Sequence, residues 1–291
     1  MFETVSKIIG EDENTSLFLV DIGVMGFQDA LKKYAERVMN IGIFEDGMIS
    51  VASGMALSGF IPIIYGITPF IVERALEQLK LDFAYQKLGG NFITTGAAYD
   101  FSTLGYSHYC PEDLGIIQML PGFEFIAPGT PKQFDKLFKA TYDNGKPTYF
   151  RLTDYTNKED VDVKFGKATV IKKGKKATII AVSTMLDIVM DACWDKDVTI
   201  LYYTTLLPFD RNTLIKNCPS NRVLLCEPHF YGILTQEVVD ALSPNSIRIG
   251  CIGLPRDISR IYGTKEEKDK YYKLTSQKIE DELRRLLCSN Y

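Results

Sequence analysis

Apolar residues along the chain follow two alternating spacings, one typical of strands and the other typical of helices. In the first half, short apolar runs predict strands at 16–20, 40–43, 61–65, 92–95, 123–126 and 148–152. Apolar residues three or four apart predict helices at 27–38, from Glu45 onward, at 71–79, at 111–119 and at 131–142. Strands that alternate with helices favour a mostly parallel sheet with helices on its faces.

A polar stretch, DYTNKEDVDVKFG at 154–166, separates this half from a second alternating unit and is interpreted as a linker. The pattern then predicts strands at 177–182, 198–202, 222–226 and 246–251, and helices at 185–193, 211–215 and 234–242. The tail over 265–287 has the pattern of one charged amphipathic helix. We therefore predict an α/β protein of two domains, residues 1–154 and 166–291, each a mostly parallel sheet flanked by helices.

Length and composition agree with a folded protein of two domains. The chain has 291 residues, of which 46% are hydrophobic and 24% are charged. Its formal net charge of −4 lacks the basic excess of nucleic-acid-binding proteins. The six cysteines form no CxxC pair, which argues against a zinc site and against a disulfide-rich secreted protein. Reduced thiols in a cytoplasmic protein are the simpler interpretation.

The pattern indicates neither a targeting segment nor a membrane span. The first 16 residues lack the apolar core of a signal peptide. Residues 49–72 carry no charge and are numerous enough to cross a bilayer, but Pro62 and Pro69 would break a continuous helix. We expect this stretch to form a helix of small residues, a strand and a loop instead.

Motifs of common self-contained active sites are missing from the sequence. There is no GxGxxG after the first strand, no GxxxxGK[ST], no GxSxG and no HExxH. Only two histidines occur, His108 and His229, which excludes a histidine-rich metal site, and we predict no metal ligands in this chain. The chemistry must therefore rest on few ionisable groups or on a cofactor.

An ordered series of motifs gives the chain a specific resemblance. The first unit contains GIFEDGM at 42–48, ITPFIVERALEQLKLDFAYQKL at 67–88, GYSHYCPEDLGIIQMLPGFEFIAPGTPKQ at 105–133 and KPTYFRL at 146–152. The second unit contains GKATVIKKGKKATIIAVSTM at 166–185, LLPFD at 206–210, LLCEPHFYG at 224–232 and IGLP at 252–255. In this order the motifs resemble the pyrimidine-binding domain and the C-terminal domain of the transketolase family.

Members of that family use thiamine diphosphate, so the resemblance implies this cofactor. Full-length members have a further domain that holds the diphosphate and Mg²⁺ and carries a GDG motif, which this sequence lacks. The resemblance therefore implies the C-terminal section of a split transketolase, with the Mg²⁺ ligands on a separate N-terminal subunit. In the family, different subunits bind the two ends of the cofactor. A heterotetramer with two chains of each kind is expected.

The resemblance assigns three residues to the cofactor. Glu45 matches the carboxyl group that hydrogen-bonds the pyrimidine ring so that the ring's amino group can act as a base; a plain carboxylate at a helix start is the alternative. Phe70 matches the aromatic ring that stacks on the aminopyrimidine, with a core phenylalanine as the alternative. Asp21 aligns with an aspartate near the cofactor at the interface between subunits, or is a turn residue after a strand.

The two histidines receive different assignments. His108, in YSHY, matches a histidine that faces the reacting carbonyl and hydroxyl groups of the sugar in the family. An imidazole can bind an enediol or move a proton near neutral pH. The alternative is a histidine whose hydrogen bonds are satisfied in a core or loop. His229, in CEPHFYG, is expected to be structural or to lie at an interface.

Four positions depart from family members that act on phosphosugars. Gly96 and Leu104 stand where a histidine and an acidic residue are expected, Asp154 replaces a phosphate-binding arginine, and Met25 replaces a serine of the same pocket. Aspartate in place of arginine removes a bidentate phosphate contact and adds repulsion. We therefore expect at least one substrate other than an ordinary phosphopentose: an unphosphorylated sugar, a nucleotide-linked sugar or a small 2-oxo acid.

Three functions are compatible with the sequence. The first is a transketolase subunit that moves a two-carbon ketol unit from a ketose to an aldehyde. The second is the beta subunit of a 2-oxo-acid dehydrogenase, although the glutamate motif of that class usually reads GIAEQ and this one reads GIFED. The third is a non-catalytic partner in assembly, against which the presence of Glu45 and His108 argues.

Overall fold

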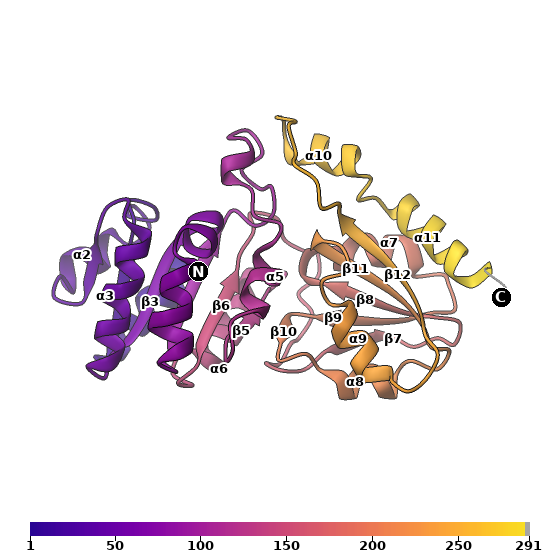
Figure 1. The fold of residues 1–291 in the computed structure, drawn as a ribbon, viewed down its shortest axis with the longest axis horizontal. Helices are drawn as coiled ribbons and strands as arrows, with labels where there is room; N and C mark the ends of the chain where they lie inside the picture. The colour runs from indigo at the N-terminus through magenta and orange to yellow at the C-terminus, as the bar shows by residue number, and fades with distance from the viewer. Residues whose placement is uncertain (289–291) are drawn as a thin grey trace.

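Two sheets lie side by side in the part of the chain that the computed structural model describes, residues 1–288 (Figure 1). The first sheet has the order β10-β5-β6-β4-β3-β1-β2, with strands β1 (Thr15–Leu19), β2 (Val38–Asn40), β3 (Ile61–Ile67), β4 (Gly90–Thr95), β5 (Glu124–Ile126), β6 (Pro147–Arg151) and β10 (Thr205–Leu207). The second has the order β12-β11-β8-β9-β7, with strands β7 (Thr169–Lys172), β8 (Thr178–Val182), β9 (Thr199–Tyr203), β11 (Arg222–Phe230) and β12 (Arg248–Leu254). Among residues 1–288, only the β10–β5 and β7–β9 pairs are antiparallel, so the prediction of two mostly parallel sheets is confirmed.

Helices flank both sheets. Those of the first unit are α1 (Phe2–Glu11), α2 (Gln28–Lys33), α3 (Glu45–Leu57), η1 (Phe70–Arg74), α4 (Leu76–Gln78), η2 (Leu79–Tyr85), η3 (Tyr106–His108), α5 (Asp113–Gln118) and α6 (Pro131–Thr141). Those of the second unit are η4 (Ser183–Met185), α7 (Leu186–Cys193), α8 (Arg211–Lys216), α9 (Thr235–Leu242), α10 (Lys265–Tyr272) and α11 (Ser276–Cys288). The uncharged stretch at 49–72 contains the expected helix (α3) and strand (β3), but the loop expected after the strand is wrong, because helical residues follow β3 directly and lead into η1. No helix within residues 1–288 is both long enough and apolar enough to cross a bilayer.

Both faces of the central strands are buried. Leu17 and Ile63 belong to a core layer that includes residues of α1 and α6, whereas Phe18 and Ile64 belong to a second layer that includes residues of α3 and α5. Successive side chains of a strand point to opposite faces, so each strand supplies both layers. Strands covered on both faces read as continuous apolar runs, which is why the sequence pattern located them.

The short strand β10 follows the polar stretch at 154–166 in the chain but belongs to the first sheet (Figure 1). Thr205 pairs with Ile126, and Leu207 pairs with Phe125. The sequence pattern does not predict this strand, because three residues are too few to show a period. Backbone pairing through β10 fixes the second unit against the first.

The boundaries of β2 and α2 differ from the predicted ones. The strand predicted at 40–43 is β2, which lies earlier because Val38 pairs with Leu17 at the edge of the sheet. The helix predicted over 27–38 ends at Lys33, since the following residues lead into that strand. The short segment 41–44, Ile-Gly-Ile-Phe, then connects β2 to α3.

The tail predicted as one helix over 265–287 is two helices. Lys273 ends α10 in the left-handed conformation, with φ of 57°. Leu274 follows and is buried, so the chain turns here to place an apolar side chain in the core. Tertiary packing therefore interrupts a pattern that is helical along its whole length.

Candidate active site

Glu45 is the first residue of α3 and lies just beyond the carboxyl end of β2. The residue is buried, with 2% of its surface exposed, and a buried carboxylate needs a partner. That partner is Arg74, whose Nη1 lies 2.6 Å from Glu45 Oε2. The helix N-terminus also favours a negative charge at this position. The motif at 42–48 therefore places a buried, ion-paired carboxyl group at the edge of the first sheet.

Two glycines permit the backbone around Glu45. Gly42 has φ of 81°, a left-handed conformation in which glycine avoids steric strain. Gly47 faces the ring of Phe44, and a Cβ at Gly47 would lie 2.0 Å from Phe44 Cε1. The ring can therefore cover the first turn of α3 only because residue 47 has no side chain.

Arg74 connects Glu45 to Phe70. The guanidinium carbon of Arg74 lies 4.3 Å from the centroid of the Phe70 ring, a cation–π contact. Phe70 and Arg74 are the first and last residues of η1, a π-helix, and such turns occur frequently at functional sites. The sequence does not mark Arg74 as a site residue, because nothing in a helical pattern shows which distant carboxylate an arginine meets.

His108 approaches Phe70 from another loop. It is the last residue of η3, and its imidazole centroid lies 5.2 Å from the Phe70 centroid in an edge-to-face arrangement. Ser107 Oγ lies 3.0 Å from His108 Nδ1. Glu45, Arg74, Phe70 and His108 thus form one continuous row of contacts, which we call the site row. The structure brings together three of the four residues that the sequence assigned to the site.

Asp21, the fourth, lies apart from the site row. It is exposed and has φ of 59° just after β1. Its backbone N–H donates to Asn40 Oδ1 at 2.9 Å, and Asn40 Nδ2 donates to Asp21 Oδ1 at 2.8 Å. These bonds join the carboxyl ends of the neighbouring parallel strands β1 and β2. Asp21 therefore shares the sheet edge that leads to Glu45.

Three further ionisable groups adjoin the site row. Glu73 precedes Arg74, Cys110 and Glu112 follow His108, and the Cys110 thiol donates to Glu73 Oε1 at 3.8 Å. Burial raises the pKa of Glu112 to about 7, and repulsion from the Glu73 carboxylate adds to this. Burial also raises the pKa of Glu73. This carboxyl pair, whose residues lie within four positions of Arg74 and His108 in the chain, can therefore hold a proton near neutral pH.

The same three groups have a spacing that a metal ion could use, since their ligand atoms lie within 4.8 Å of one another. Burial, however, raises the pKa of the Cys110 thiol well above its usual range. The thiolate is the form that binds metals, so a neutral thiol is a poor ligand. The chemistry of the cluster favours proton storage over metal binding. Sequence analysis missed it because its carboxyl groups come from separate elements.

The four positions that depart from phosphosugar enzymes have defined environments. Met25 and Leu104 are exposed. Gly96 has φ of 80°, and a Cβ there would lie 2.5 Å from Phe101 Cε2, so no side chain fits. Asp154 is exposed just after β6. Because β4 and β6 are neighbouring parallel strands, Gly96 and Asp154 lie at the same sheet edge, where α/β proteins bind ligands.

His229 is fully buried in β11. Its Nδ1 lies 3.1 Å from the carbonyl oxygen of Phe230. Burial lowers the pKa of His229 to about 3, and the charge of Arg151 adds to this. Arg151 is itself buried and pairs with Asp113 at 2.7 Å. His229 is therefore neutral at physiological pH, and its structural or interfacial role stays a prediction.

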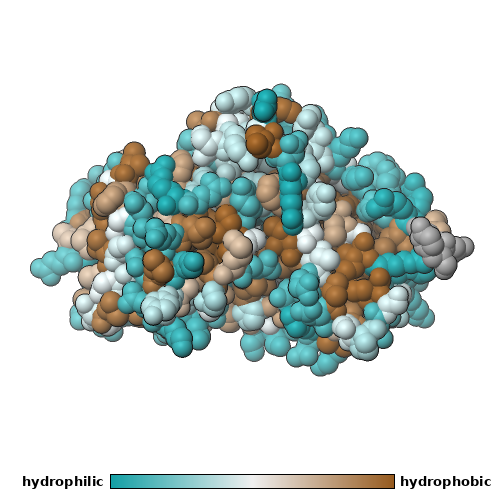
Figure 2. All heavy atoms as spheres, viewed as in Figure 1, coloured by the Kyte–Doolittle hydropathy of each residue, from teal (hydrophilic) through white to brown (hydrophobic). Residues whose placement is uncertain are grey.

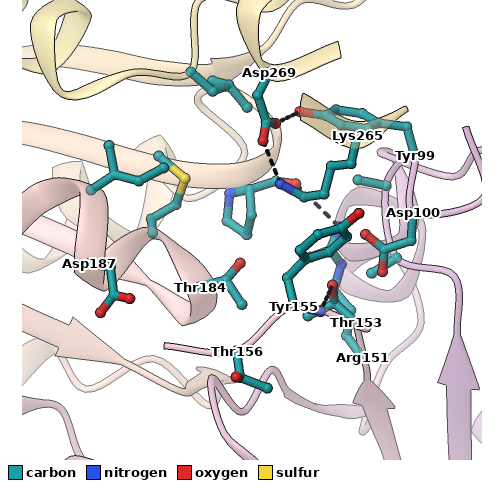
Figure 3. A pocket seen from close by; sticks show the side chains of 16 residues that line it. Tyr99, Asp100, Arg151, Thr153, Tyr155, Thr156, Thr184, Asp187, Lys265 and Asp269 are labelled. Atoms are coloured by element: carbon teal, nitrogen blue, oxygen red, sulfur yellow. Dashed lines mark hydrogen bonds and ion pairs between the residues drawn. The ribbon is translucent and has the colours of Figure 1, made fainter. Parts of the chain in front are cut away.

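A cavity of about 170 Å³ lies between the two units (Figure 3). Burial raises the pKa of Asp100, in its wall, to about 6, although a hydrogen bond from Thr153 and the charge of Arg151 oppose this. Lys265 and Asp269 of α10 also line the cavity and lie 2.7 Å apart. Residues of the site row are not among those that line the cavity. It is therefore a feature of the junction between the units, separate from the site row.

Comparisons with known proteins cover nearly the whole chain. Residues 7–156 match the family model described as the transketolase pyrimidine binding domain. The chain is 32% identical to a protein of Rhodococcoides fascians named as an uncharacterized 33.6 kDa protein in the fasciation locus, over 98% of this chain and 92% of that protein. It is 26% identical to one subunit of the apulose-4-phosphate transketolase of Phocaeicola vulgatus, over 95% and 93%. Its fold matches a split gene transketolase described as an inactive beta4 tetramer, with a TM-score of 0.87 and 25% identity over 98% and 96%.

Proposed function

The chain belongs to the transketolase family, and on this premise we propose that it is the C-terminal subunit of a split transketolase that requires thiamine diphosphate and a separate N-terminal subunit. The reaction transfers a two-carbon ketol unit from a ketose to an aldehyde. The observation that carries the proposal is the site row, in which Arg74 connects the buried Glu45 carboxyl group to the Phe70 ring and the His108 imidazole packs against that ring.

The residues of the site row fit the pyrimidine end of thiamine diphosphate. Glu45 offers a buried carboxyl group for a ring nitrogen, and Phe70 offers an aromatic face for stacking. When bound, the cofactor supplies the nucleophilic carbon that takes up the two-carbon unit. Arg74 binds one carboxylate oxygen of Glu45. When the pyrimidine ring of the cofactor binds, Arg74 must share the carboxyl group with that ring or turn toward solvent. The latter is open to it, because 43% of its side chain is exposed.

The other groups of the site receive complementary roles. His108 hydrogen-bonds the carbonyl and hydroxyl groups of the sugar, and the Glu73–Glu112 pair keeps a proton beside it. Asp21 contacts the cofactor across the interface with the other subunit, for which its exposure at the sheet edge leaves it accessible. The Mg²⁺ ligands belong to the N-terminal subunit.

At least one substrate is other than an ordinary phosphopentose. The Phocaeicola vulgatus relative is named for apulose 4-phosphate, which supports a specialised sugar substrate. At the edge where a phosphate ligand is expected, this chain has Gly96, which cannot be replaced without a clash, and the carboxylate Asp154. Neither can attract a phosphate group.

Exposed apolar side chains support a partner. Ile43 and Phe44 directly precede Glu45, Val51 and Leu57 lie further along α3, and all four are exposed. Figure 2 shows apolar side chains interrupting the polar surface over the first unit. Apolar surface of this kind marks sites of protein contact. We propose a heterotetramer with two chains of each kind, and the inactive beta4 tetramer of the similar protein supports both self-association and inactivity of this chain alone.

The domain organisation is part of the same proposal. Residues 1–154 form the pyrimidine-binding domain, which the family match to residues 7–156 supports, and residues 166–291 form the C-terminal domain. The six free cysteines support a reducing compartment, and we propose the cytoplasm.

The proposal is tested by calorimetric titration of thiamine diphosphate with Mg²⁺ into this chain, into the N-terminal subunit encoded by a neighbouring gene, and into the mixture. Tight binding and ketol transfer are expected only for the mixture. Glu45→Gln should reduce the turnover of the mixture by about 100-fold or more, because it removes an acid–base group, whereas Asp46→Asn one residue later should not.

The alternatives give different results. Tight binding by this chain alone would reveal a diphosphate site within it and contradict the split arrangement. Release of carbon dioxide from a 2-oxo acid, without ketol transfer, would indicate a 2-oxo-acid dehydrogenase subunit. Full activity of the Glu45→Gln mixture would leave only an assembly role for this chain.

A further inference from the structure

The loop that carries His108 is held by the second unit. This loop, residues 96–112, projects beyond the first sheet and lies beside the segment that contains α10 (Figure 1). An antiparallel bridge between Ala98 and Cys110 closes its base. We call residues 96–112 the His108 loop and residues 255–274 the C-terminal strap. The contacts between them involve the residue next to His108.

Tyr109 is buried between the loop and the strap, with 4% of its surface exposed. Its hydroxyl group lies 2.9 Å from the carbonyl oxygen of Ser102 in the loop and 3.2 Å from that of Ile261 in the strap. The hydroxyl can donate to either oxygen. Because Tyr109 follows His108 directly, its anchoring also fixes the backbone of His108.

Lys268 of α10 covers the other side of Tyr109. Its Nζ lies 4.5 Å from the centroid of the Tyr109 ring and donates to Ser259 Oγ at 2.6 Å. The residue is fully buried, and no ion pair of Lys268 with a carboxylate occurs within residues 1–288. A desolvated cation over a tyrosine face makes a strong cation–π contact. The burial of Lys268 thus depends on Tyr109 being in place.

Two more residues of the His108 loop, Gly105 and Tyr99, lie against the strap. Gly105 has φ of 87°, and a Cβ there would lie 2.5 Å from Tyr262 Cε1 in the strap. The Tyr99 hydroxyl donates to the carboxylate of Asp269, which also pairs with Lys265 (Figure 3). The strap therefore contacts the His108 loop at Tyr99, Gly105 and Tyr109. His108 itself has a looser environment, with Ser107 and the edge of Phe70 as its neighbours.

We propose that the C-terminal strap positions His108 for the substrate by anchoring Tyr109 between Lys268 and Ile261, so that the second unit sets substrate affinity in the first. This inference rests on the proposed function, in which His108 binds the sugar. Tyr109 and Lys268 are positioning residues that act through His108. A displaced His108 loses contacts with the sugar that it makes equally in the ground state and the transition state, so the loss is expected in KM.

The test uses the complete enzyme for kinetics and the full chain for hydrogen exchange measured by mass spectrometry. Tyr109→Phe removes only the hydroxyl group, and Lys268→Met removes the cation but keeps the length of the side chain. Tyr271→Phe and Lys270→Met are matched controls, because both residues are exposed on the same helix. Lys268→Arg keeps a cation over the ring and should restore wild-type behaviour.

Both variants should speed exchange in peptides covering 99–112 by about 10-fold and leave peptides of α3 unchanged, because only the loop loses its anchor. In the complete enzyme, they should raise KM for the sugar by about 10-fold with kcat changed less than about twofold. A merely structural role predicts a lower fraction of active enzyme, hence a lower kcat with KM unchanged.

Hydrogen exchange tests the anchoring of the loop, and kinetics tests the positioning of His108, so failure of the inference can be told from failure of the proposed function. Unchanged exchange in both variants would overturn the anchoring of the loop. Faster exchange with unchanged KM would overturn the positioning of His108. If the wild-type complex transfers no ketol unit, the proposed function fails and the positioning of His108 for a sugar fails with it, while the exchange data still decide whether the strap anchors the loop.

Discussion

The carboxylate of Glu45 and the guanidinium of Arg74 form an ion pair with unequal burial. Their atoms lie 2.6 Å apart, and 3% of the Glu45 side chain is exposed against 43% of the Arg74 side chain. The buried partner is thus held in place by a group that can still move into solvent. Such an arrangement stabilises the carboxyl group in the free protein and leaves a route for another hydrogen-bond donor to reach it.

The first prediction concerns the energy of this pair. Arg74→Met should lower the free energy of unfolding by about 1–2 kcal/mol, because it leaves a buried carboxylate unpaired; a fully buried pair would cost about 3–5 kcal/mol, and the exposure of Arg74 reduces this. In the Glu45→Gln background the same change should cost little. Urea denaturation at pH 7 gives the double-mutant cycle, with Lys80→Met in the exposed part of η2 as control. Additivity within about 0.5 kcal/mol would contradict the coupling.

The second prediction compares two glycines of α3. Gly54→Ala should stabilise the protein by up to about 1 kcal/mol, since alanine favours a helix and nothing lies within 4 Å of the added Cβ. Gly47→Ala should destabilise it, because the Cβ would meet the Phe44 ring at 2.0 Å. Thermal unfolding and thiamine diphosphate affinity of the complex measure both effects. Equal stabilisation by the two substitutions would show that Phe44 moves freely.

The third prediction is a pH dependence of stability from the Glu73–Glu112 pair. The pKa of Glu112 is about 7 in the folded protein against an ordinary value of 4.5, so the folded state binds more protons between these pH values. The stability that Glu112 contributes by holding its proton in the folded state is complete below about pH 4.5 and is lost as the pH rises to about 7. Glu112→Gln should flatten this decline, whereas the exposed Glu77→Gln should not. The free energy of unfolding is measured by urea denaturation at several pH values. The same decline with pH in wild type and Glu112→Gln would refute a proton held by the Glu73–Glu112 pair.

The fourth prediction concerns substrate choice at Asp154. Asp154→Arg restores a bidentate phosphate ligand at an exposed position, so folding should change by less than about 0.5 kcal/mol. The variant should lower KM for a phosphorylated sugar relative to its unphosphorylated form by about 10-fold, a typical effect of a charge-assisted contact. Asp143→Arg makes the same charge change at the amino end of β6 and serves as control. Equal effects of the two variants would mean a general electrostatic attraction instead of a specific contact.

The long buried strands were predictable from the sequence, but the short strand β10 and the break between α10 and α11 were not. Strands such as β3 and β8 are buried on both faces, so their apolar runs are long and unambiguous. The strand β10 has three residues and exists because β5 offers an unpaired edge to it. The break at Lys273 likewise follows from the packing of Leu274, which the helical pattern of the tail does not reveal.

The sequence by itself determined the family, most of the strands and helices, and the candidate residues Glu45, Phe70 and His108, because motifs are local and their spacing survives in the chain. Only the tertiary structure decided which groups meet: Arg74 at Glu45, Glu73 at Glu112, and Lys268 at Tyr109. These contacts join elements far apart in sequence. Their energies depend on burial and on distances of a few ångströms, which no local pattern encodes.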